Sequence, residues 1–194
     1  TSEIPDRFAR ASRTGIPEPG DRVAGAVVAA LGAADALTAV DERWPVDRVS
    51  AALAEAGVES VDGDELAKAL ERWTPRLTSS AAVIALKQAA RYSVRLLVPG
   101  DPAWPSGLAD LGDHAPLALW LRGNESTLGT AERSIALVGA RAATGYGEHV
   151  AMEASAGLVD RGYTIVSGAA YGIDGMAHRA ALASSGQTIA FLAG

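Results

Sequence analysis

Apolar residues recur every three or four positions in the first part of the chain, a spacing typical of helices that bury one face. Asp21 opens the first such stretch, in which Val23, Val27 and Leu31 form one stripe. Gly32 closes this stretch, since glycine commonly ends helices. The same spacing predicts three more helices, at 45–57, at 63–73 and, behind a Thr78/Ser79 cap, at 78–92.

Short helices joined by short loops favour a compact bundle, so residues 21–88 are predicted to form a small all-helical domain. Residues 1–20 contain three prolines among scattered charges. This composition predicts an extended segment ahead of the helical domain.

A different pattern begins at residue 89. Residues 89–133 hold short apolar runs among prolines and turn residues, which predicts a connecting extension of strands and loops that belongs to the Rossmann-like domain described next. Residues 134–194 alternate between predicted strands and helices, which indicates an α/β, Rossmann-like domain with a parallel sheet and right-handed crossovers. Because the chain stops directly after its third predicted strand, we expect the sheet to continue beyond Gly194. The three strands are predicted at 134–139, 163–167 and 187–194.

The turn after the first of these strands, residues 138–147, reads "VGARAATGYG". A dinucleotide-binding turn needs a second glycine where Arg141 stands, so an NAD or FAD site is not indicated. Thr144 is predicted to cap the helix that follows. An arginine beside the N–H groups of a helix N-terminus is typical of a phosphate site. The alternative is a surface arginine that pairs with a nearby acidic residue.

The next turn reads "SGAAYGIDGMAH" and begins at Ser167. Gly168 and Gly172 permit sharp changes of backbone direction. Asp174 is predicted as the N-cap of the following helix, with His178 one turn further on the same face. A cap carboxylate hydrogen-bonded to an imidazole would explain this pair structurally, and a nucleophile, acid and base is the alternative. The G-x-S-x-G elbow of serine hydrolases is not present in this stretch.

Both turns follow neighbouring parallel strands, and open α/β sheets bind ligands at the carboxyl ends of their strands. We therefore predict a phosphate-binding pocket, with Asp174 and His178 as the residues that shape it. The residues predicted to line it are Gly139, Arg141, Thr144, Ser167, Gly168, Ala169 and Gly172.

The chain has 194 residues, a net charge of −6 and no cysteine. Neither residues 1–88 nor residues 89–194 are basic, so phosphate binding must come from a local cluster and from N–H groups. The lack of cysteine, of a signal peptide and of an apolar run near the length of a membrane span predicts a cytoplasmic protein without a membrane contact. The three histidines are scattered, so no metal site and no cofactor are expected.

Three stretches carry a resemblance to a known family: "GDPAWPSGLADLGDHAPLALWLRG" (100–123), "ALVGARAATGYG" (136–147) and "VSGAAYGIDGMAHRAAL" (166–182). With these stretches the chain resembles the DNA processing protein A (DprA/Smf) family. The predicted helices fit the small domain, similar to SAM and helix-hairpin-helix domains, that often precedes the family's Rossmann-like domain.

The resemblance implies a recombination mediator and not an enzyme. Such a protein binds and protects single-stranded DNA, loads a RecA-type recombinase onto it in DNA-mediated transformation, and forms a homodimer at full length. By position in the motifs, Arg141 would contact a backbone phosphate, and Ser167, Gly168 and the following turn would line the pocket. Phosphate contacts would make the affinity depend strongly on salt.

Two other functions fit parts of the sequence. The two turns are also similar to those of the lysine-decarboxylase-like (LOG) phosphoribohydrolases, which bind nucleoside monophosphates. Asp174, which stands where those enzymes have methionine, and His178 favour the DprA/Smf resemblance. The other alternative is a helical protein-interaction module on an inert Rossmann-like scaffold, although Arg141 in a glycine-rich turn argues against it.

Overall fold

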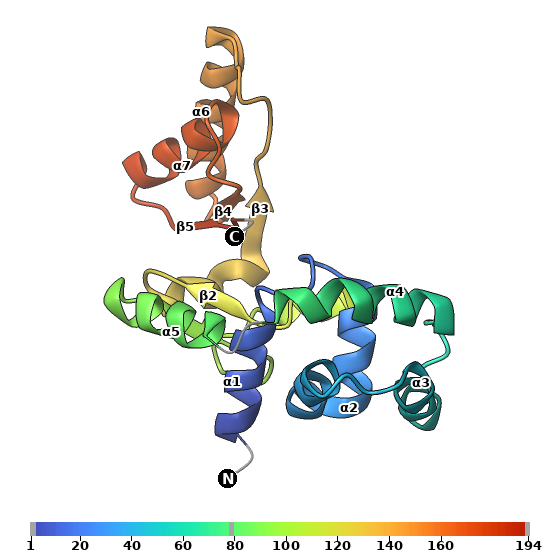
Figure 1. Cartoon of the computed structure of the whole chain (residues 1–194). Coiled ribbons are helices and arrows are strands. Elements are labelled where there is room, and N and C mark those ends of the chain that lie inside the picture. Colours follow the sequence, from blue (N-terminus) through green and yellow to red (C-terminus); the bar gives the residue numbers. More distant parts are fainter. Residues whose placement is uncertain (1–2, 78–79, 193–194) are drawn as a thin grey trace. The chain divides into compact units, whose positions relative to one another are not determined.

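The computed structural model describes residues 3–77 and 80–192, so the predicted cap at Thr78 and Ser79 lies outside the described residues. Contacts divide the chain into two compact units (Figure 1), which we call the N-terminal unit (Thr1–Gly123) and the C-terminal unit (Asn124–Gly194). This division falls within the segment 89–133. The domain limits inferred from composition, at residues 20, 88 and 133, stay a prediction.

Helix α2 (Arg22–Asp41) is the central helix of the N-terminal unit. Asp21 caps it, because its side chain accepts hydrogen bonds from the N–H groups of Val23 at 3.1 Å and Ala24 at 3.3 Å. The backbone leaves the helical conformation at Gly32, with φ 79° and ψ 163°, where the sequence predicted the end of the helix. The helix then resumes beyond Gly32, in a part that the sequence pattern did not predict.

The other predicted helices of this unit are present, and two of them, α3 and α4, pack against α2. Val49 of α3, Leu66 of α4 and Trp73 of α4 are fully buried against it and form the centre of the core. The bounds are α3 (Val46–Glu55), α4 (Gly63–Trp73), the 3-10 turn η1 (Thr74–Arg76) and α5 (Ala81–Arg91).

Helix α1 (Glu3–Arg13) occupies the segment that the sequence predicted to be extended. Its proline, Pro5, lies in the first turn, where a missing N–H breaks no helical hydrogen bond. Arg10 donates to Asp6 at 2.7 Å, one turn away, which further supports the helix. Proline content was therefore a misleading signal for this segment.

Residues that the sequence grouped with the Rossmann-like domain pack in the N-terminal unit instead. Strands β1 (Arg95–Leu97) and β2 (Leu119–Leu121) form an antiparallel pair. Arg7 of α1 donates to the carbonyl of Leu96 at 2.8 Å. The 3-10 segment η2 (Ser106–His114) contacts α2 so closely that a Cβ on Gly25 would overlap the backbone of Asp113.

Arg13, the last residue of α1, is fully buried. Its guanidinium lies 5.4 Å from the ring centroid of Trp73, and none of its three nitrogens has a hydrogen-bond partner among the described residues. Burial lowers the pKa of Arg13 to about 10, although the negative charge of Asp21 partly opposes this shift. The core of the N-terminal unit therefore contains a cation without a direct partner.

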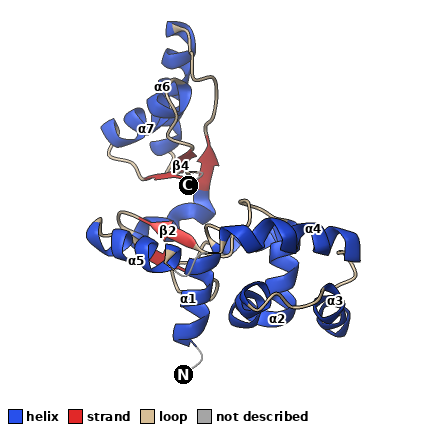
Figure 2. Cartoon of the chain, in the orientation of Figure 1, coloured by secondary structure: helices blue, strands red, loops and turns tan. Residues whose placement is uncertain are grey.

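The C-terminal unit contains a parallel sheet in the order β3-β4-β5, with two helices packed against each other. Because the strands lie in sequence order, right-handed crossovers place both helices on one face of the sheet, as Figures 1 and 2 show. The chain is thus an α/β protein with N-terminal helices, as predicted. The bounds are η3 (Glu125–Arg133), β3 (Ser134–Ala136), α6 (Gly145–Val159), β4 (Thr164–Ser167), α7 (Ile173–Ala183) and β5 (Thr188–Ala190).

Small residues let the two helices of this unit approach each other. Ala177 and Ala181 of α7 are fully buried over Ile165 of β4. Ser155 of α6 is also fully buried, and its hydroxyl donates to the Ala177 carbonyl at 2.7 Å. This contact ties α6 to α7.

Helix α2 is also the one helix of the described chain that is long and apolar enough to cross a membrane, with a mean hydropathy of 1.9. The expectation that no apolar run approaches that length is therefore wrong. Half of the apolar stretch is buried inside the N-terminal unit, and Gly32 interrupts it. Core helices show the same features, so the composition of α2 is weak support for a membrane span.

Replacing Arg13 with methionine tests the unpaired guanidinium. We expect Arg13→Met to raise the free energy of unfolding of the N-terminal unit by about 1 kcal/mol or more, because an apolar side chain of similar length removes an uncompensated buried charge. All four tryptophans lie in this unit, so tryptophan fluorescence during urea unfolding measures the effect. Arg122→Met, at an exposed arginine, is the matched control. An unchanged or lower stability of Arg13→Met would show that the guanidinium is compensated.

Candidate functional site

The two predicted turns lie side by side at one edge of the sheet. Strands β3 and β4 pair in parallel, with Ser134 opposite Thr164, so both turns leave the carboxyl ends of neighbouring strands. We call residues 137–144, between β3 and α6, the first turn, and residues 168–172, between β4 and α7, the second turn. The predicted site residues on these turns are therefore brought together.

A single buried carboxylate connects the two turns. Asp174 accepts a hydrogen bond from the Gly139 N–H of the first turn at 3.2 Å. It also accepts from the N–H groups of Gly168 at 3.2 Å and Ala170 at 3.4 Å in the second turn. Asp174 is not the N-cap of α7, because Gly172 occupies that position. The predicted acid is present, but it joins two turns where the sequence predicted a helix cap.

These hydrogen bonds control the ionisation of Asp174. Burial favours the neutral acid and on its own would raise the pKa. The N–H groups of Gly139, Ala170 and Gly168 outweigh burial and, with a smaller contribution from Ser167, hold the pKa of Asp174 below its ordinary value. The group is therefore a carboxylate at neutral pH, with its charge directed at backbone N–H groups.

Two glycines allow the turns to touch. Gly172 has φ 77°, and a Cβ at this position would overlap the carbonyl oxygens of Ala140 and Arg141. A Cβ on Gly139 would lie 2.7 Å from the side chain of Ile173. Both positions therefore require glycine for close approach, whether or not a ligand binds.

His178 differs from its prediction, because its ring does not hydrogen-bond to Asp174. Its Nδ1 lies 2.6 Å from the hydroxyl of Thr188, which itself donates to the Ile165 carbonyl at 2.8 Å. The hydroxyl proton is thus in use, so Nδ1–H donates to Thr188, and in the neutral ring Nε2 then carries no proton. Nε2 is buried and has no partner among the described residues. Burial lowers the pKa of His178, although the charge of Asp174 partly opposes this.

Arg141 projects from the first turn into solvent. Within residues 3–77 and 80–192 it forms no ion pair or hydrogen bond, so the alternative of a surface arginine paired with an acid is not what the structure shows. Thr144 caps α6 as predicted, because its Oγ1 accepts from the Gly147 N–H at 3.2 Å. The N–H groups of Gly145 and Tyr146, in the first turn of α6, have no acceptor in the described part of the chain.

Several groups that were predicted to face a ligand already have partners inside the protein. The N–H groups of Gly139 and Gly168 donate to Asp174, and the Ser167 hydroxyl donates to the Leu137 carbonyl at 2.6 Å. Ala169 differs, since it is exposed and has the left-handed φ of 54° that few residues other than glycine adopt. The groups left for a ligand are the Arg141 guanidinium, the Thr144 hydroxyl, the Ala169 N–H and the first turn of α6.

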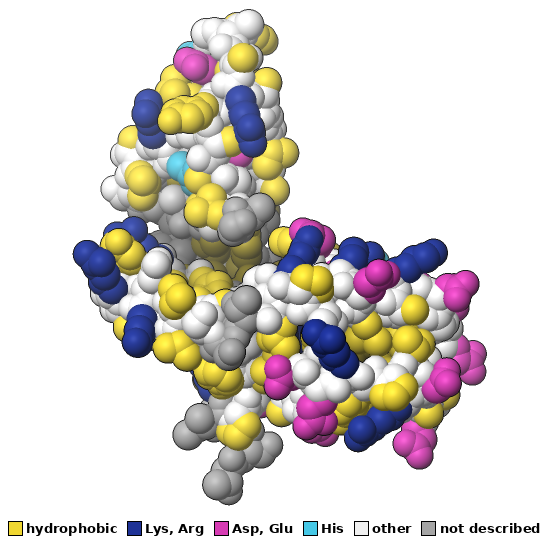
Figure 3. Space-filling view, in the orientation of Figure 1, with side chains coloured by type: hydrophobic (Ala, Val, Ile, Leu, Met, Phe, Trp, Pro, Cys, Tyr) yellow, Lys and Arg dark blue, Asp and Glu magenta, His cyan; other side chains and the backbone are white. Residues whose placement is uncertain are grey.

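The net charge of the chain comes from one segment of the N-terminal unit. Residues 41–71 hold nine acidic and three basic residues, so this segment alone accounts for the whole net charge of −6. Figure 3 shows acidic side chains gathered over α3 and α4. The remainder of the chain has balanced charges, so the overall net charge does not argue against anion binding at the two turns.

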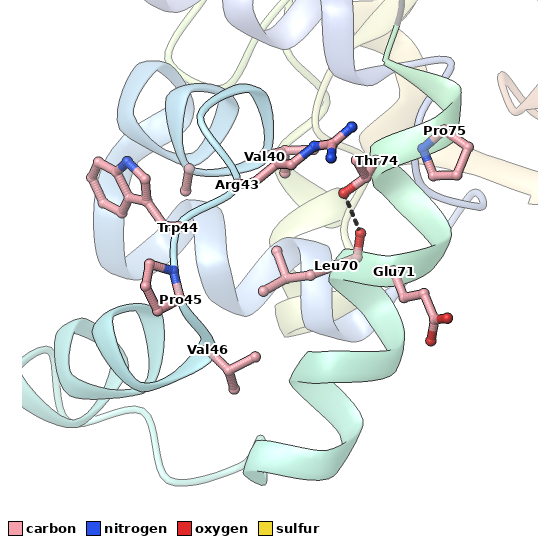
Figure 4. A pocket seen from close by; sticks show the side chains of 10 residues that line it. Val40, Arg43, Trp44, Pro45, Val46, Leu70, Glu71, Thr74 and Pro75 are labelled. Carbon is pink, nitrogen blue, oxygen red and sulfur yellow. Dashed lines mark hydrogen bonds between the residues drawn. The ribbon is translucent and has the colours of Figure 1, made fainter.

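A cavity of about 420 Å³ lies in the N-terminal unit, between the end of α2 and the helices α3 and α4 (Figure 4). In this view the Thr74 hydroxyl donates to the Leu70 carbonyl at 2.7 Å. The cavity borders the acidic segment and contains none of the predicted site residues. The described residues include no cluster of three metal-ligating side chains. The lining residues are Ala39, Val40, Arg43, Trp44, Pro45, Val46, Leu70, Glu71, Thr74 and Pro75.

Comparison with known proteins identifies related sequences over the part of the chain that contains both turns. A family model described as DNA recombination-mediator protein A matches residues 95–194. A DNA processing protein DprA of Mycobacterium tuberculosis is 48% identical over 114 residues, which are 54% of this chain and 29% of that protein. DNA processing protein DprA of Bacillus subtilis is 30% identical over 156 residues, covering 78% of this chain and 50% of that protein.

A solved structure shows the same fold. The X-ray structure of DNA processing protein A (DprA) from Streptococcus pneumoniae superposes with a TM-score of 0.56 at 21% identity. The superposition covers 94% of this chain and 55% of that one. The chain thus spans about half or less of the length of each of these three proteins.

The hydrogen bonds of Asp174 predict a pH-dependent stability of the C-terminal unit. We expect Asp174→Asn to lower its free energy of unfolding by about 2 kcal/mol at neutral pH, because a charged acceptor is lost. The pKa of Asp174 is lower in the folded protein than the value of 3.8 in the unfolded chain. Its contribution to the free energy of unfolding is therefore complete above pH 3.8 and is lost as the pH falls toward the folded pKa. Urea unfolding followed by circular dichroism measures this loss of stability. Tryptophan fluorescence follows the N-terminal unit separately, because all four tryptophans lie there. Asp160→Asn, at an exposed aspartate of the same unit, should have little effect.

The buried imidazole of His178 makes the stability of the C-terminal unit depend on pH in a second, less acidic range. Its lowered pKa means that the unfolded chain binds a proton more readily, so stability decreases as the pH falls through 6.5 toward the folded pKa. We expect urea unfolding of the C-terminal unit to be more sensitive to pH in the wild type than in His178→Gln. The exposed His149 provides the control His149→Gln. Equal pH profiles of wild type and His178→Gln would contradict the lowered pKa.

Proposed function

The chain belongs to the DNA recombination-mediator protein A family, and from this premise we propose that it binds single-stranded DNA through the backbone phosphates. Family membership supports a DNA-processing role connected with recombination. In our proposal the protein protects the single strand and loads a RecA-type recombinase onto it, as in DNA-mediated transformation. This work takes place in the cytoplasm.

One observation carries the proposal: Arg141 is an exposed arginine without an acidic partner in the described chain, on a turn with a fixed backbone. The site contains a buried carboxylate, Asp174. Here the carboxylate is fully engaged by backbone N–H groups, so it does not compete for the arginine. Arg141 therefore remains available for an anion from outside the protein.

The surroundings of Arg141 suit a phosphate. The first turn of α6 offers the N–H groups of Gly145 and Tyr146, and helix N-termini favour anions. The Thr144 hydroxyl accepts from Gly147, which leaves its own proton for donation. The Ala169 N–H of the second turn lies on the exposed side of the same edge. In this proposal Gly139, Ser167, Gly168 and Gly172 shape the site, while the four groups above contact the phosphate.

The arrangement of the polar side chains supports binding over catalysis. The side chain of Ser167 is buried, and its hydroxyl is hydrogen-bonded to the Leu137 carbonyl. The imidazole of His178 is bonded to Thr188 and faces β5, not the serine. The serine, aspartate and histidine are thus held in structural contacts, and among the described residues the imidazole is hydrogen-bonded to neither of the other two.

The proposal extends to partners of the whole protein. We infer a homodimer at full length and an interface for a RecA-type recombinase. The described residues carry neither partner, and the related proteins are longer than this chain.

Substitution of Arg141 tests the phosphate site. We expect Arg141→Ala to weaken binding of a fluorescein-labelled oligothymidylate by about tenfold and to lower the slope of log K against log salt concentration by about 0.7, because one phosphate contact is lost. Fluorescence anisotropy at several salt concentrations measures both quantities. Arg141→Lys should keep most of the slope, since the charge remains.

Arg179→Ala is the matched control, because Arg179 is an exposed arginine of the same unit on α7, away from the turns. It should leave the affinity nearly unchanged. An Arg141→Ala protein with wild-type affinity and salt slope would rule out the proposed site.

A further inference from the structure

Two tyrosines on the two turns have their rings in solvent. Tyr146 is 79% exposed and Tyr171 is 89% exposed, the two largest values among the exposed large hydrophobic side chains of the described residues. Folded proteins usually bury the body of a tyrosine ring and leave only its hydroxyl near water. Two open rings at one edge of a sheet therefore indicate a surface that contacts another molecule.

The backbone contacts of the turns place the backbones of both tyrosines close to that of Arg141. Gly172 follows Tyr171 and lies against the carbonyl of Arg141, with no room for a Cβ. Tyr146 belongs to the first turn of α6, directly behind the Thr144 cap. The hydrogen bonds of Asp174 fix the two turns to each other, so the cation and the rings stand on one rigid support.

This combination fits a nucleotide whose base is not paired. An arginine binds the phosphate, while an aromatic ring stacks on the flat face of a base, whatever the base is. In a duplex the neighbouring base pairs cover these faces, whereas a single strand can turn them toward a protein. The rings therefore add a contact that only an unpaired strand can use.

Tyrosine and arginine are also common at the centres of protein–protein interfaces. The polar surroundings favour the nucleic acid here, because the unpaired cation stands beside the free N–H groups of α6, which attract an anion. A protein partner would need an acidic group at this point as well as an apolar contact for the rings.

We propose that Tyr146 and Tyr171 stack on the bases of the strand whose backbone Arg141 holds, and that these contacts give the site its preference for single-stranded over duplex DNA. The proposal rests on the proposed function and adds base contacts to the phosphate contacts. The tyrosines determine which form of DNA is bound, while Arg141 determines the dependence on salt.

The experiment compares three labelled probes by fluorescence anisotropy, each about 20 nucleotides long so that it spans a typical binding site. The probes are an oligothymidylate, an abasic oligomer with the same number of phosphates, and a duplex. We expect Tyr146→Ala and Tyr171→Ala each to weaken oligothymidylate binding by about tenfold, with the salt slope unchanged. Binding of the abasic oligomer and of the duplex should not change. Tyr146→Phe and Tyr171→Phe should keep the wild-type affinity, because the ring remains.

Tyr92→Ala is the control, since Tyr92 is 53% exposed in the other unit. Equal weakening of the abasic oligomer and the oligothymidylate would show that the tyrosines act on the fold and would overturn stacking. Wild-type affinity of both alanine variants, with weaker binding by Arg141→Ala, would overturn the stacking proposal and leave the phosphate site standing. It would then favour a protein as the partner of the rings. Wild-type affinity of Arg141→Ala would count against the proposed function itself.

Discussion

The carboxylate of Asp174 accepts hydrogen bonds from backbone N–H groups of two separate turns, and the geometry of the candidate site depends on this interaction. Both turns leave the ends of short strands and hold three glycines between them, so their own sequences do little to restrict the backbone. A charged acceptor between them replaces the water that these N–H groups would otherwise need. The second constraint is steric, because Gly172 brings the turns into backbone contact beside Arg141.

This arrangement separates the residues that hold the site from those that face solvent. Asp174, Ser167 and His178 are engaged with N–H, carbonyl and hydroxyl groups of the protein. Arg141, by contrast, is exposed and unpaired in the described structure. A sequence motif that contains serine, aspartate and histidine can therefore describe the frame of a binding site without describing a reaction.

The sequence predicted those features that depend on local spacing. The alternation after residue 134 predicted the parallel sheet, and Asp21 and Thr144 cap the predicted helices. The sequence did not predict the hydrogen bond from Gly139 to Asp174, because the two residues are 35 positions apart and no local pattern indicates such a contact. Helix α1 was missed for a similar reason. The three prolines of residues 1–20 suggest an extended chain, while the stability of the helix comes from distant contacts, such as that of Arg7 with Leu96.

The order of the strands has a consequence for how the two units form. In the C-terminal unit each strand pairs with the strand that precedes it, β3 with β4 and β4 with β5. Because consecutive strands pair, the unit can assemble stepwise as the chain is synthesised. Helix α1 differs, because Arg7 and Arg10 bind carbonyls that lie 89 and 107 positions further along. Helix α1 is synthesised before these partners, so it must wait for much of the N-terminal unit before it can dock.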